Sequence, residues 1–202
     1  MPDSLPLVIV GAGGLGREVA ALVEARNAQE TVWDLRGFVD DDDGLHDASI
    51  IGYPVLGSVE WLSHQGNLFY VIAIGDERTR RTIASQLDDA HVEPTPLIHP
   101  SVSVHRTTTV GPGTILCRRA SPTVDIQIGA HVVVDQQCTV GHDSTLAAFA
   151  TLHPGCRISG SVRLETGVTV GAGAVVLPNT KIGAHATVGA GAVVTEDLPP
   201  EC

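Results

Sequence analysis

The hydrophobic pattern divides the chain into two parts with different periods. In the first 95 or so residues, apolar runs alternate with segments of helical period. The runs "PLVIV", "LRGFV" and "LFYVIAIG" predict buried strands, and "YPVLGS" predicts a short strand or turn. Helices are predicted over Arg17–Arg26, Val59–Ser63 and Asp76–Leu87. This βαβ layout is typical of a parallel sheet covered by helices, at about half the size of a full dinucleotide-binding fold.

From Ile98 onward, an aliphatic residue returns every six positions. A small or β-branched residue precedes most of them by two positions, so both side chains share one face of a short strand. Only Pro122 interrupts the series, and the register continues past it. Such hexapeptide repeats predict a β-helix with three hexapeptides per coil, in which residues 18 apart stack. The aliphatic positions are Ile98, Val104, Val110, Leu116, Ile128, Val134, Val140, Leu146, Leu152, Ile158, Leu164, Val170, Val176, Ile182, Val188 and Val194.

Composition and charge narrow the possible partners. Hydrophobic residues make up 43% of the 202 residues and aromatic ones only 3%, so the core must be aliphatic. The net charge of −11 argues against nucleic acid and anionic membranes as partners. No run reaches transmembrane length, and "MPDSLP" lacks the features of a secretory signal. Four cysteines show no metal-type spacing, so we expect a cytoplasmic protein with reduced thiols and no metal.

The N-terminal stretch "LVIVGAGGLGREVAALVEA" matches a dinucleotide-binding fingerprint. Gly11, Gly13 and Gly16 fit G-x-G-x-x-G between a predicted strand and a predicted helix. Taken alone, the loop suggests a nicotinamide-dependent oxidoreductase. That interpretation leaves the long hexapeptide array without a purpose, so the loop is expected to hold a different nucleotide.

A histidine and a carboxylate fall together on one predicted corner of the β-helix. His142 and Asp143 follow the inward-pointing Val140 by two and three positions, so both side chains are expected to point away from the core. A neutral imidazole can take a proton from an attacking group, so His142 is a candidate general base. A nearby carboxylate can fix the tautomer of the ring and stabilise the imidazolium.

A second corner carries Asp135, His153, Gly171 and Gly189, each 18 residues from the next. Its two "GAG" runs would let a long, thin ligand approach the backbone closely, although turn geometry explains them equally well. Because this is not the His142 corner, we hypothesise that the two meet between subunits of a cyclic trimer.

Other polar residues leave alternatives open. Arg118 and Arg119, beside Pro122, either bind phosphates or decorate a distorted coil. A metal lyase would need three converging histidines, but His131, His142 and His153 are spaced by eleven, which does not suit a close histidine pair.

Taken together, these motifs resemble the bacterial sugar acyltransferases, a family that includes sialic-acid O-acetyltransferases and N-acetyltransferases of UDP- or GDP-linked amino sugars. The resemblance runs from "VIVGAGGLGREV" through "GFVDDD", "IAIGDERTR", "LIHPSV" and "VGHDSTLA" to "VGAGAVVLPN" and "VGAGAVVT". It implies an α/β, Rossmann-like acceptor domain over residues 1–95. A left-handed parallel β-helix over residues 96–202 would carry the acyltransferase chemistry.

The resemblance also implies three sets of site residues. His142 would be the catalytic base, with Asp143 beside it. The nucleotide part of the acceptor would lie against Gly13, Gly14, Leu15, Asp40, Asp41 and Gly75. Acetyl-CoA would lie along Thr151, Gly160, Ala172 and Ala190. Many members carry histidine at the positions of Leu15 and Thr151, so this chain departs from the pattern at both.

The function expected from these residues is transfer of an acetyl group from acetyl-CoA to the amine of a nucleotide-linked amino sugar. The amine would attack directly, without an acyl-enzyme, because no cysteine occupies the His142 corner. O-acetylation of sialic acid or another sugar hydroxyl is the close alternative, and a nicotinamide-dependent oxidoreductase is a more distant one. The expected assembly is a homotrimer.

Overall fold

The computed structural model describes residues 4–202; the first three, part of the N-terminal stretch considered above, lie outside the described residues. The chain divides into two compact units between Leu97 and Ile98, whereas the sequence placed the boundary after residue 95. No helix among the described residues is long and apolar enough to cross a membrane.

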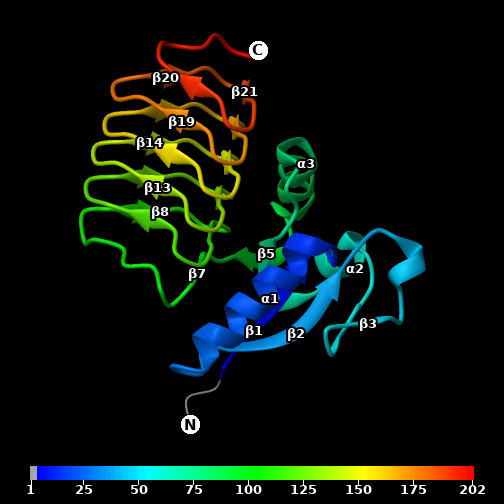
Figure 1. Cartoon of the computed structure of the whole chain (residues 1–202). Helices are drawn as coiled ribbons and strands as arrows, with labels where there is room; N and C mark the ends of the chain where they lie inside the picture. Colours follow the sequence, from blue (N-terminus) through cyan, green and yellow to red (C-terminus); the bar gives the residue numbers. More distant parts are fainter. Residues whose placement is uncertain (1–3) are drawn as a thin grey trace. The chain divides into compact units, whose positions relative to one another are not determined.

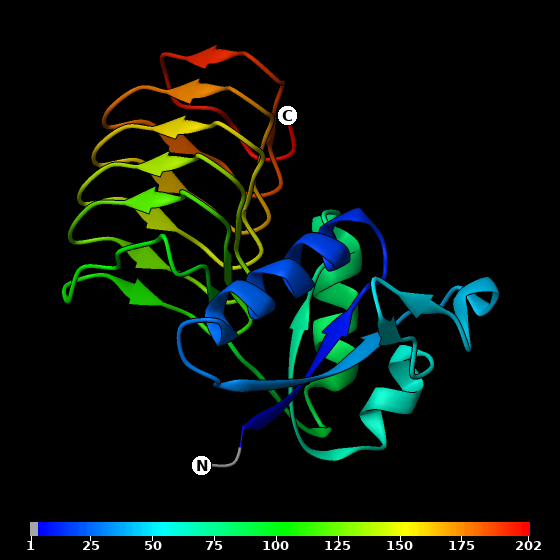
Figure 2. The same cartoon turned by 60° about the horizontal axis from the view of Figure 1, so that its bottom comes forward.

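The N-terminal unit is built on a four-stranded parallel sheet of order β2-β1-β5-β6 (Figure 1). Helix α1 lies on one face of the sheet, and α2 and α3 lie on the other (Figures 1 and 2). The strand order reverses between β1 and β5, and in open α/β sheets ligands bind beyond the carboxyl ends of strands at such a point. The elements of the unit are β1(Leu5–Val10), α1(Gly14–Asn27), β2(Trp33–Val39), the 3₁₀ turn η1(Asp43–Leu45), β3(Ser49–Ile50), β4(Tyr53–Pro54), α2(Val59–Ser63), β5(Gly66–Ile72), α3(Glu77–Leu87) and β6(His91–Pro94).

The strand β6 was absent from the sequence prediction. Its four residues contain one buried apolar side chain, Val92, so they show no alternation that could be recognised. The strand pairs with β5 alone and forms one edge of the sheet.

The C-terminal unit is a stack of triangular coils, which Figure 2 shows from its green first coil to its red last one. Three parallel sheets form the sides, and every strand pairs with residues 18 away, as in Val140↔Ile158. The unit is a left-handed parallel β-helix. The β10–β22 sheet contains β10(Ser121–Pro122), β13(Thr139–Val140), β16(Arg157–Ile158), β19(Val175–Val176) and β22(Val193–Val194). The β8–β20 sheet contains β8(Thr109–Val110), β11(Gln127–Ile128), β14(Thr145–Leu146), β17(Arg163–Leu164) and β20(Lys181–Ile182). The β7–β21 sheet contains β7(Leu97–Ile98), β9(Ile115–Leu116), β12(Val133–Val134), β15(Thr151–Leu152), β18(Thr169–Val170) and β21(Thr187–Val188).

The hexapeptide residues fill the interior of the prism. Both members of each pair are buried in most coils, for example Cys138 with Val140 and Ala150 with Leu152. The first coil is an exception, because residues 102–104 keep the spacing but form no strand. The prediction of a strand at Val104 was therefore wrong, and the β10–β22 sheet begins one coil later than its repeat does.

Candidate functional site

The turns that join the β10–β22 sheet to the β8–β20 sheet form what we call the His142 corner: residues 123–126, 141–144, 159–162 and 177–180. Backbone hydrogen bonds fix the turn of residues 141–144 from both sides. The Asp143 N–H donates to the carbonyl of Val124 at 3.3 Å, and the Ser161 N–H donates to the carbonyl of His142 at 2.7 Å. Asp143 adopts the left-handed conformation, with φ of 59°. The backbone carrying both side chains is thus held by the coils on either side.

His142 and Asp143 form a hydrogen-bonded pair. The Nδ1 atom of His142 lies 2.7 Å from Oδ2 of Asp143, and the two side chains are 63% and 61% exposed. Because an ionised carboxylate only accepts, Nδ1 carries the proton in the pair, and the lone pair of the neutral ring lies on Nε2. The exposed corner thus presents an unprotonated ring nitrogen to solvent, which is what a general base requires.

Gly160 lies one coil beyond His142 and leaves room for its ring. A Cβ atom at Gly160 would stand 2.7 Å from Nε2 and 2.8 Å from Cε1 of His142. Gly141 leaves room for the backbone of the next coil, since a Cβ there would stand 2.5 Å from the backbone nitrogen of Gly160. Two glycines therefore permit the coils to stack while the imidazole lies flat against the next turn.

The four residues expected along acetyl-CoA lie in three different places. Gly160 belongs to the His142 corner, and Thr151 lies in β15 of the β7–β21 sheet. Ala172 and Ala190 occupy successive turns of another corner, linked by the hydrogen bond from Gly191 N to the carbonyl of Ala172 at 2.9 Å. We call this the Ala172 corner; it comprises residues 117–120, 135–138, 153–156, 171–174 and 189–192. Within one β-helix, the structure therefore does not bring Ala172 and Ala190 beside His142.

The Ala172 corner also contains two stacked thiols. The Sγ atoms of Cys138 and Cys156 both donate to the carbonyl of His153, at 3.1 and 2.8 Å, and all four cysteines of the chain are free. The hydrogen bond with Cys156 and burial raise the pKa of Cys138 above its ordinary value. Both thiols behave as packed core groups. Among residues 4–202, no group of three His, Cys, Asp or Glu side chains is placed to hold a metal ion.

In the N-terminal unit, the glycine-rich loop joins β1 to α1, and its glycines have two kinds of environment. Gly11 has φ of 100°, and a Cβ on Gly16 would collide with the carbonyl oxygen of Gly11. Local geometry therefore explains both. A Cβ at Gly13 or Gly14 would meet no atom within 4 Å, so packing does not explain these two. Helix α1 begins here without a side-chain cap, and its first N–H groups suit an anion.

The acidic residues after β2 accept hydrogen bonds from the glycine-rich loop, from the loop after β2 itself and from the start of α2. The carboxylate of Asp40 accepts the N–H of Ala12 at 2.8 Å and that of Asp42 at 3.0 Å. Asp41 accepts the N–H of Val59 at 2.9 Å, at the start of α2. Both carboxylates thus have structural partners, and the atoms left for a ligand are their remaining lone pairs.

Arg80 is a functional candidate that the sequence analysis missed. Its guanidinium is fully buried and donates to the carbonyls of Ile74 and Gly75 at 2.7 and 3.1 Å. Burial lowers the pKa of Arg80 to about 10, against the opposing influence of Glu77 and Asp76. Arg80 thereby fixes the loop that contains the expected acceptor residue Gly75. The signal was its place on the apolar stripe of α3, where helical spacing puts a charged residue in line with Ile83.

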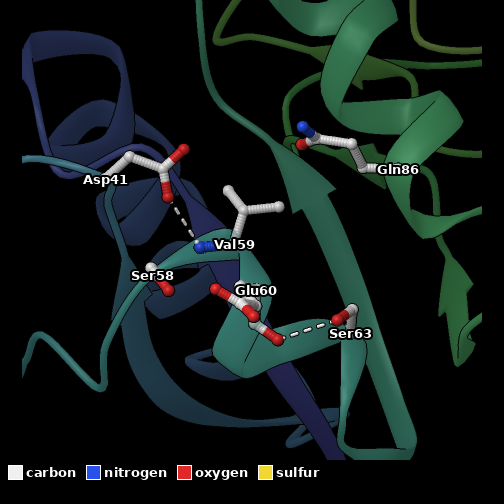
Figure 3. Close-up of a pocket in the computed structure, with 6 residues that line it drawn as sticks. All are labelled: Asp41, Ser58, Val59, Glu60, Ser63 and Gln86. Atoms are coloured by element: carbon white, nitrogen blue, oxygen red, sulfur yellow. Dashed lines mark hydrogen bonds between the residues drawn. The ribbon is translucent and has the colours of Figure 1, made fainter.

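A pocket of about 450 Å³ opens beside Asp41. Figure 3 shows Asp41, Ser58, Glu60 and Ser63 on one side and Gln86 of α3 facing them. Of the expected acceptor residues, only Asp41 lines it.

Each of the two parts of the chain matches a known protein family. Residues 6–87 match the PglD N-terminal domain, and residues 161–196 match the bacterial transferase hexapeptide family of six repeats. No curated protein matches the chain in sequence at a significant level.

Solved structures match nearly the whole chain. The acetyltransferase domain of PglB from Neisseria gonorrhoeae, in complex with acetyl coenzyme A, is 29% identical, with a TM-score of 0.87 over 98% of this chain and 95% of that one. A histidine-to-asparagine variant of perosamine N-acetyltransferase from Caulobacter crescentus, in complex with CoA and GDP-perosamine, is also 29% identical, with a TM-score of 0.86 over 99% and 92%. WeeI from Acinetobacter baumannii is 28% identical, with a TM-score of 0.85 over 96% and 93%.

These matches cover the α/β unit and the β-helix in the same chain, so they account for the hexapeptide array that an oxidoreductase would leave unused. The chain is therefore an acyltransferase that is similar in both of its parts to sugar N-acetyltransferases of the hexapeptide-repeat type.

Proposed function

We propose that the protein transfers an acetyl group from acetyl-CoA to the amine of a nucleotide-linked amino sugar. The observation that carries the proposal is the exposed His142–Asp143 pair, with its Nε2 atom against Gly160. The similar proteins support both substrates, since one was solved with acetyl coenzyme A and another with CoA and GDP-perosamine.

In the proposed reaction, the amine nitrogen attacks the thioester carbonyl while Nε2 of His142 takes a proton from the amine. Asp143 holds the ring through Nδ1 and stabilises the imidazolium that forms. The C–S bond then breaks, and the imidazolium returns its proton to the departing thiolate of CoA. No acyl-enzyme is needed, and among residues 4–202 no cysteine lies on the His142 corner.

The proposed assembly is a homotrimer in which the Ala172 corner of one subunit faces the His142 corner of the next. The placement of Ala172 and Ala190 away from His142 within a single β-helix motivates this arrangement. Cyclic symmetry would then create three equivalent sites. Four free thiols suit a reducing compartment, so the proposal places the enzyme in the cytoplasm.

In the N-terminal unit, the proposal assigns the nucleotide part of the acceptor to Gly13, Gly14, Leu15, Asp40, Asp41 and Gly75. The open space at Gly13 and Gly14 and the uncapped start of α1 support that assignment. Thr151, Gly160, Ala172 and Ala190 are assigned to acetyl-CoA.

The experiment is a thiol-release assay with acetyl-CoA against UDP-, GDP- and dTDP-linked amino sugars, with sialic acid as the hydroxyl acceptor. Turnover with an amino sugar and a product acetylated at nitrogen, located by NMR, would support the proposal. Turnover with sialic acid alone would replace it by O-acetylation, and turnover with no acceptor would refute the acceptor class.

A further inference from the structure

The first coil of the β-helix opens at the edge of the β10–β22 sheet, and Pro122 provides a physical reason. The N–H groups of Ser121 and Thr123 donate to the coil above, at the carbonyls of Cys138 and Val140. The intervening position therefore faces the coil below, where proline has no N–H to offer. Residues 103–104 form no strand there, and a pocket of about 500 Å³ is lined by Ser103 and His105 of this coil and by residues 119–124 of the next.

Basic and hydroxyl side chains line this pocket, which we call the first-coil pocket. Its lining includes Ser103, His105, Arg119, Ser121, Thr123 and Val124. In a chain of net charge −11, such a lining is unusual, because it contains two basic side chains and no carboxylate. The composition suits an anion that also carries hydroxyl groups.

The backbone of Arg119 is fixed, while its guanidinium is unused. Arg119 has φ of 61°, and its N–H donates to Oγ of Ser101 at 2.9 Å. The residue is exposed, and among residues 4–202 its guanidinium has no hydrogen bond or ion pair within the chain. A planar guanidinium with free N–H groups matches the geometry of a phosphate.

A chain of hydrogen bonds orients His105 as a second donor. The Asp125 N–H donates to Oγ1 of Thr107 at 3.0 Å, so the hydroxyl proton of Thr107 is free to donate to Nδ1 of His105, 2.9 Å away. With Nδ1 accepting, the neutral ring carries its proton on Nε2. His105 can thereby donate an N–H from Nε2 in either charge state.

The first-coil pocket borders the His142 corner directly. Val124 lines the pocket, and its carbonyl accepts the N–H of Asp143 at 3.3 Å. Thr123, also in the lining, donates through Oγ1 to the carbonyl of Val140 at 3.2 Å, two residues before His142. One coil therefore separates the pocket from the base, a rise of about 4.8 Å.

We propose that the first-coil pocket binds a phosphate of the nucleotide-linked acceptor, with Arg119 as its main ligand and His105 as its second. This inference rests on the proposed function. CoA also carries phosphates, but the four residues assigned to it, Thr151, Gly160, Ala172 and Ala190, all lie in later coils than Arg119 and His105. A phosphate held in the first-coil pocket would therefore lie one coil before His142, whereas the residues assigned to CoA lie after it in the chain.

The test compares Arg119→Gln, Arg119→Lys and the control Arg163→Gln. Arg163 is an exposed arginine of β17 whose side chain likewise has no partner among the described residues. All three variants should keep the thermal unfolding temperature, because a glutamine or lysine fits the backbone of position 119 as arginine does. KM for the nucleotide amino sugar and KM for acetyl-CoA are measured separately, and binding of UDP and GDP alone is measured by calorimetry.

We expect Arg119→Gln to raise the acceptor KM about 10-fold or more, equivalent to about 1.4 kcal/mol of binding free energy. KM for acetyl-CoA should stay constant, nucleoside diphosphate binding should weaken in parallel, and Arg119→Lys should restore part of the affinity. Arg163→Gln should change neither constant.

Two results would overturn the inference while the wild-type enzyme still turns over: an acceptor KM in Arg119→Gln no higher than in Arg163→Gln, or a rise in KM for acetyl-CoA instead. Absence of turnover in the wild type would refute the proposed function. In that case the binding of UDP and GDP still tests the pocket. Weaker binding by Arg119→Gln than by the wild type would support the first-coil pocket as a phosphate site, and equal binding by the two proteins would refute it.

Discussion

Replacing Gly160 by alanine should displace the His142 ring and lower the catalytic rate, although the histidine itself is unchanged. The new Cβ would stand 2.7 Å from Nε2 and 2.8 Å from Cε1 of His142, whereas comfortable contacts between carbon atoms are about 3.5–4.0 Å. The ring must therefore retreat by roughly 1 Å. It can do so only by turning away from the next coil or by lengthening its 2.7 Å bond to Asp143.

The expected loss follows from that displacement. A misplacement of about 1 Å costs on the order of 100-fold in rate, within the 10²–10⁴-fold that a general base contributes. We expect kcat of Gly160→Ala to fall about 100-fold, or about 2.7 kcal/mol in activation free energy. The fold should persist, because φ of Gly160 lies outside the left-handed region.

The assay is thiol release at saturating acetyl-CoA, with thermal unfolding by circular dichroism. Gly66→Ala is the control, since a Cβ there would meet only the Cβ of His91, at 4.0 Å. Because Gly160 is also assigned to acetyl-CoA, the double variant with His142→Ala separates the two roles. No further loss in the double variant means that the methyl acts through His142. A kcat within threefold of wild type for Gly160→Ala would refute the reasoning.

Three further predictions concern the support of the two units. Asp143→Asn should lower kcat about 10-fold with little change in KM. This loss corresponds to the lower end of the free energy of a hydrogen bond to a charged group, because both side chains of the pair are exposed. An unchanged kcat would contradict the role given to Asp143. Arg80→Met should lower the free energy of unfolding, measured in urea, by about 3–5 kcal/mol, because it removes the hydrogen bonds to the carbonyls of Ile74 and Gly75 and leaves the buried Glu77 with Arg78 alone as a neighbouring cation. Asp76→Ala should lower it by about 1 kcal/mol at neutral pH, since Asp76 caps α3. Hydrogen bonds from Thr79 lower the pKa of Asp76 below its ordinary 3.8, so its contribution is present above that pH and is lost as pH falls through the folded-state pKa; a difference between variant and wild type that persists in acid would contradict this account.

The sequence predicted the β-helix well because its signal is local. Period two within a strand and period six between strands fix which side chains face inward, and the observed register of 18 residues follows from three strands per coil. The same arithmetic placed His142 and Asp143 on an outward corner. Val104 shows the limit of this spacing argument. The six-residue spacing includes Val104, but no strand forms there, because Pro122 in the next coil has no N–H to donate to the hydrogen-bond ladder between the two coils.

Features that depend on three-dimensional contacts were not predictable. The packing of the His142 ring against Gly160 depends on the rise between coils and on one side-chain rotamer. Arg80 was overlooked because a charged residue on an apolar helical stripe is recognised only when the carbonyls it binds are known. Asp40 was expected to receive a ligand, yet its carboxylate also holds the N–H groups of Ala12 and Asp42.

The most direct measurement of the central claim is the single-turnover rate of acetyl transfer by wild type and His142→Ala, with acetyl-CoA binding measured in the same samples. If Nε2 of His142 takes the proton from the attacking amine, the rate should fall by about 10²–10⁴-fold. The affinity for acetyl-CoA and the oligomeric state should remain those of the wild type. A variant that transfers the acetyl group at the wild-type rate would contradict the account.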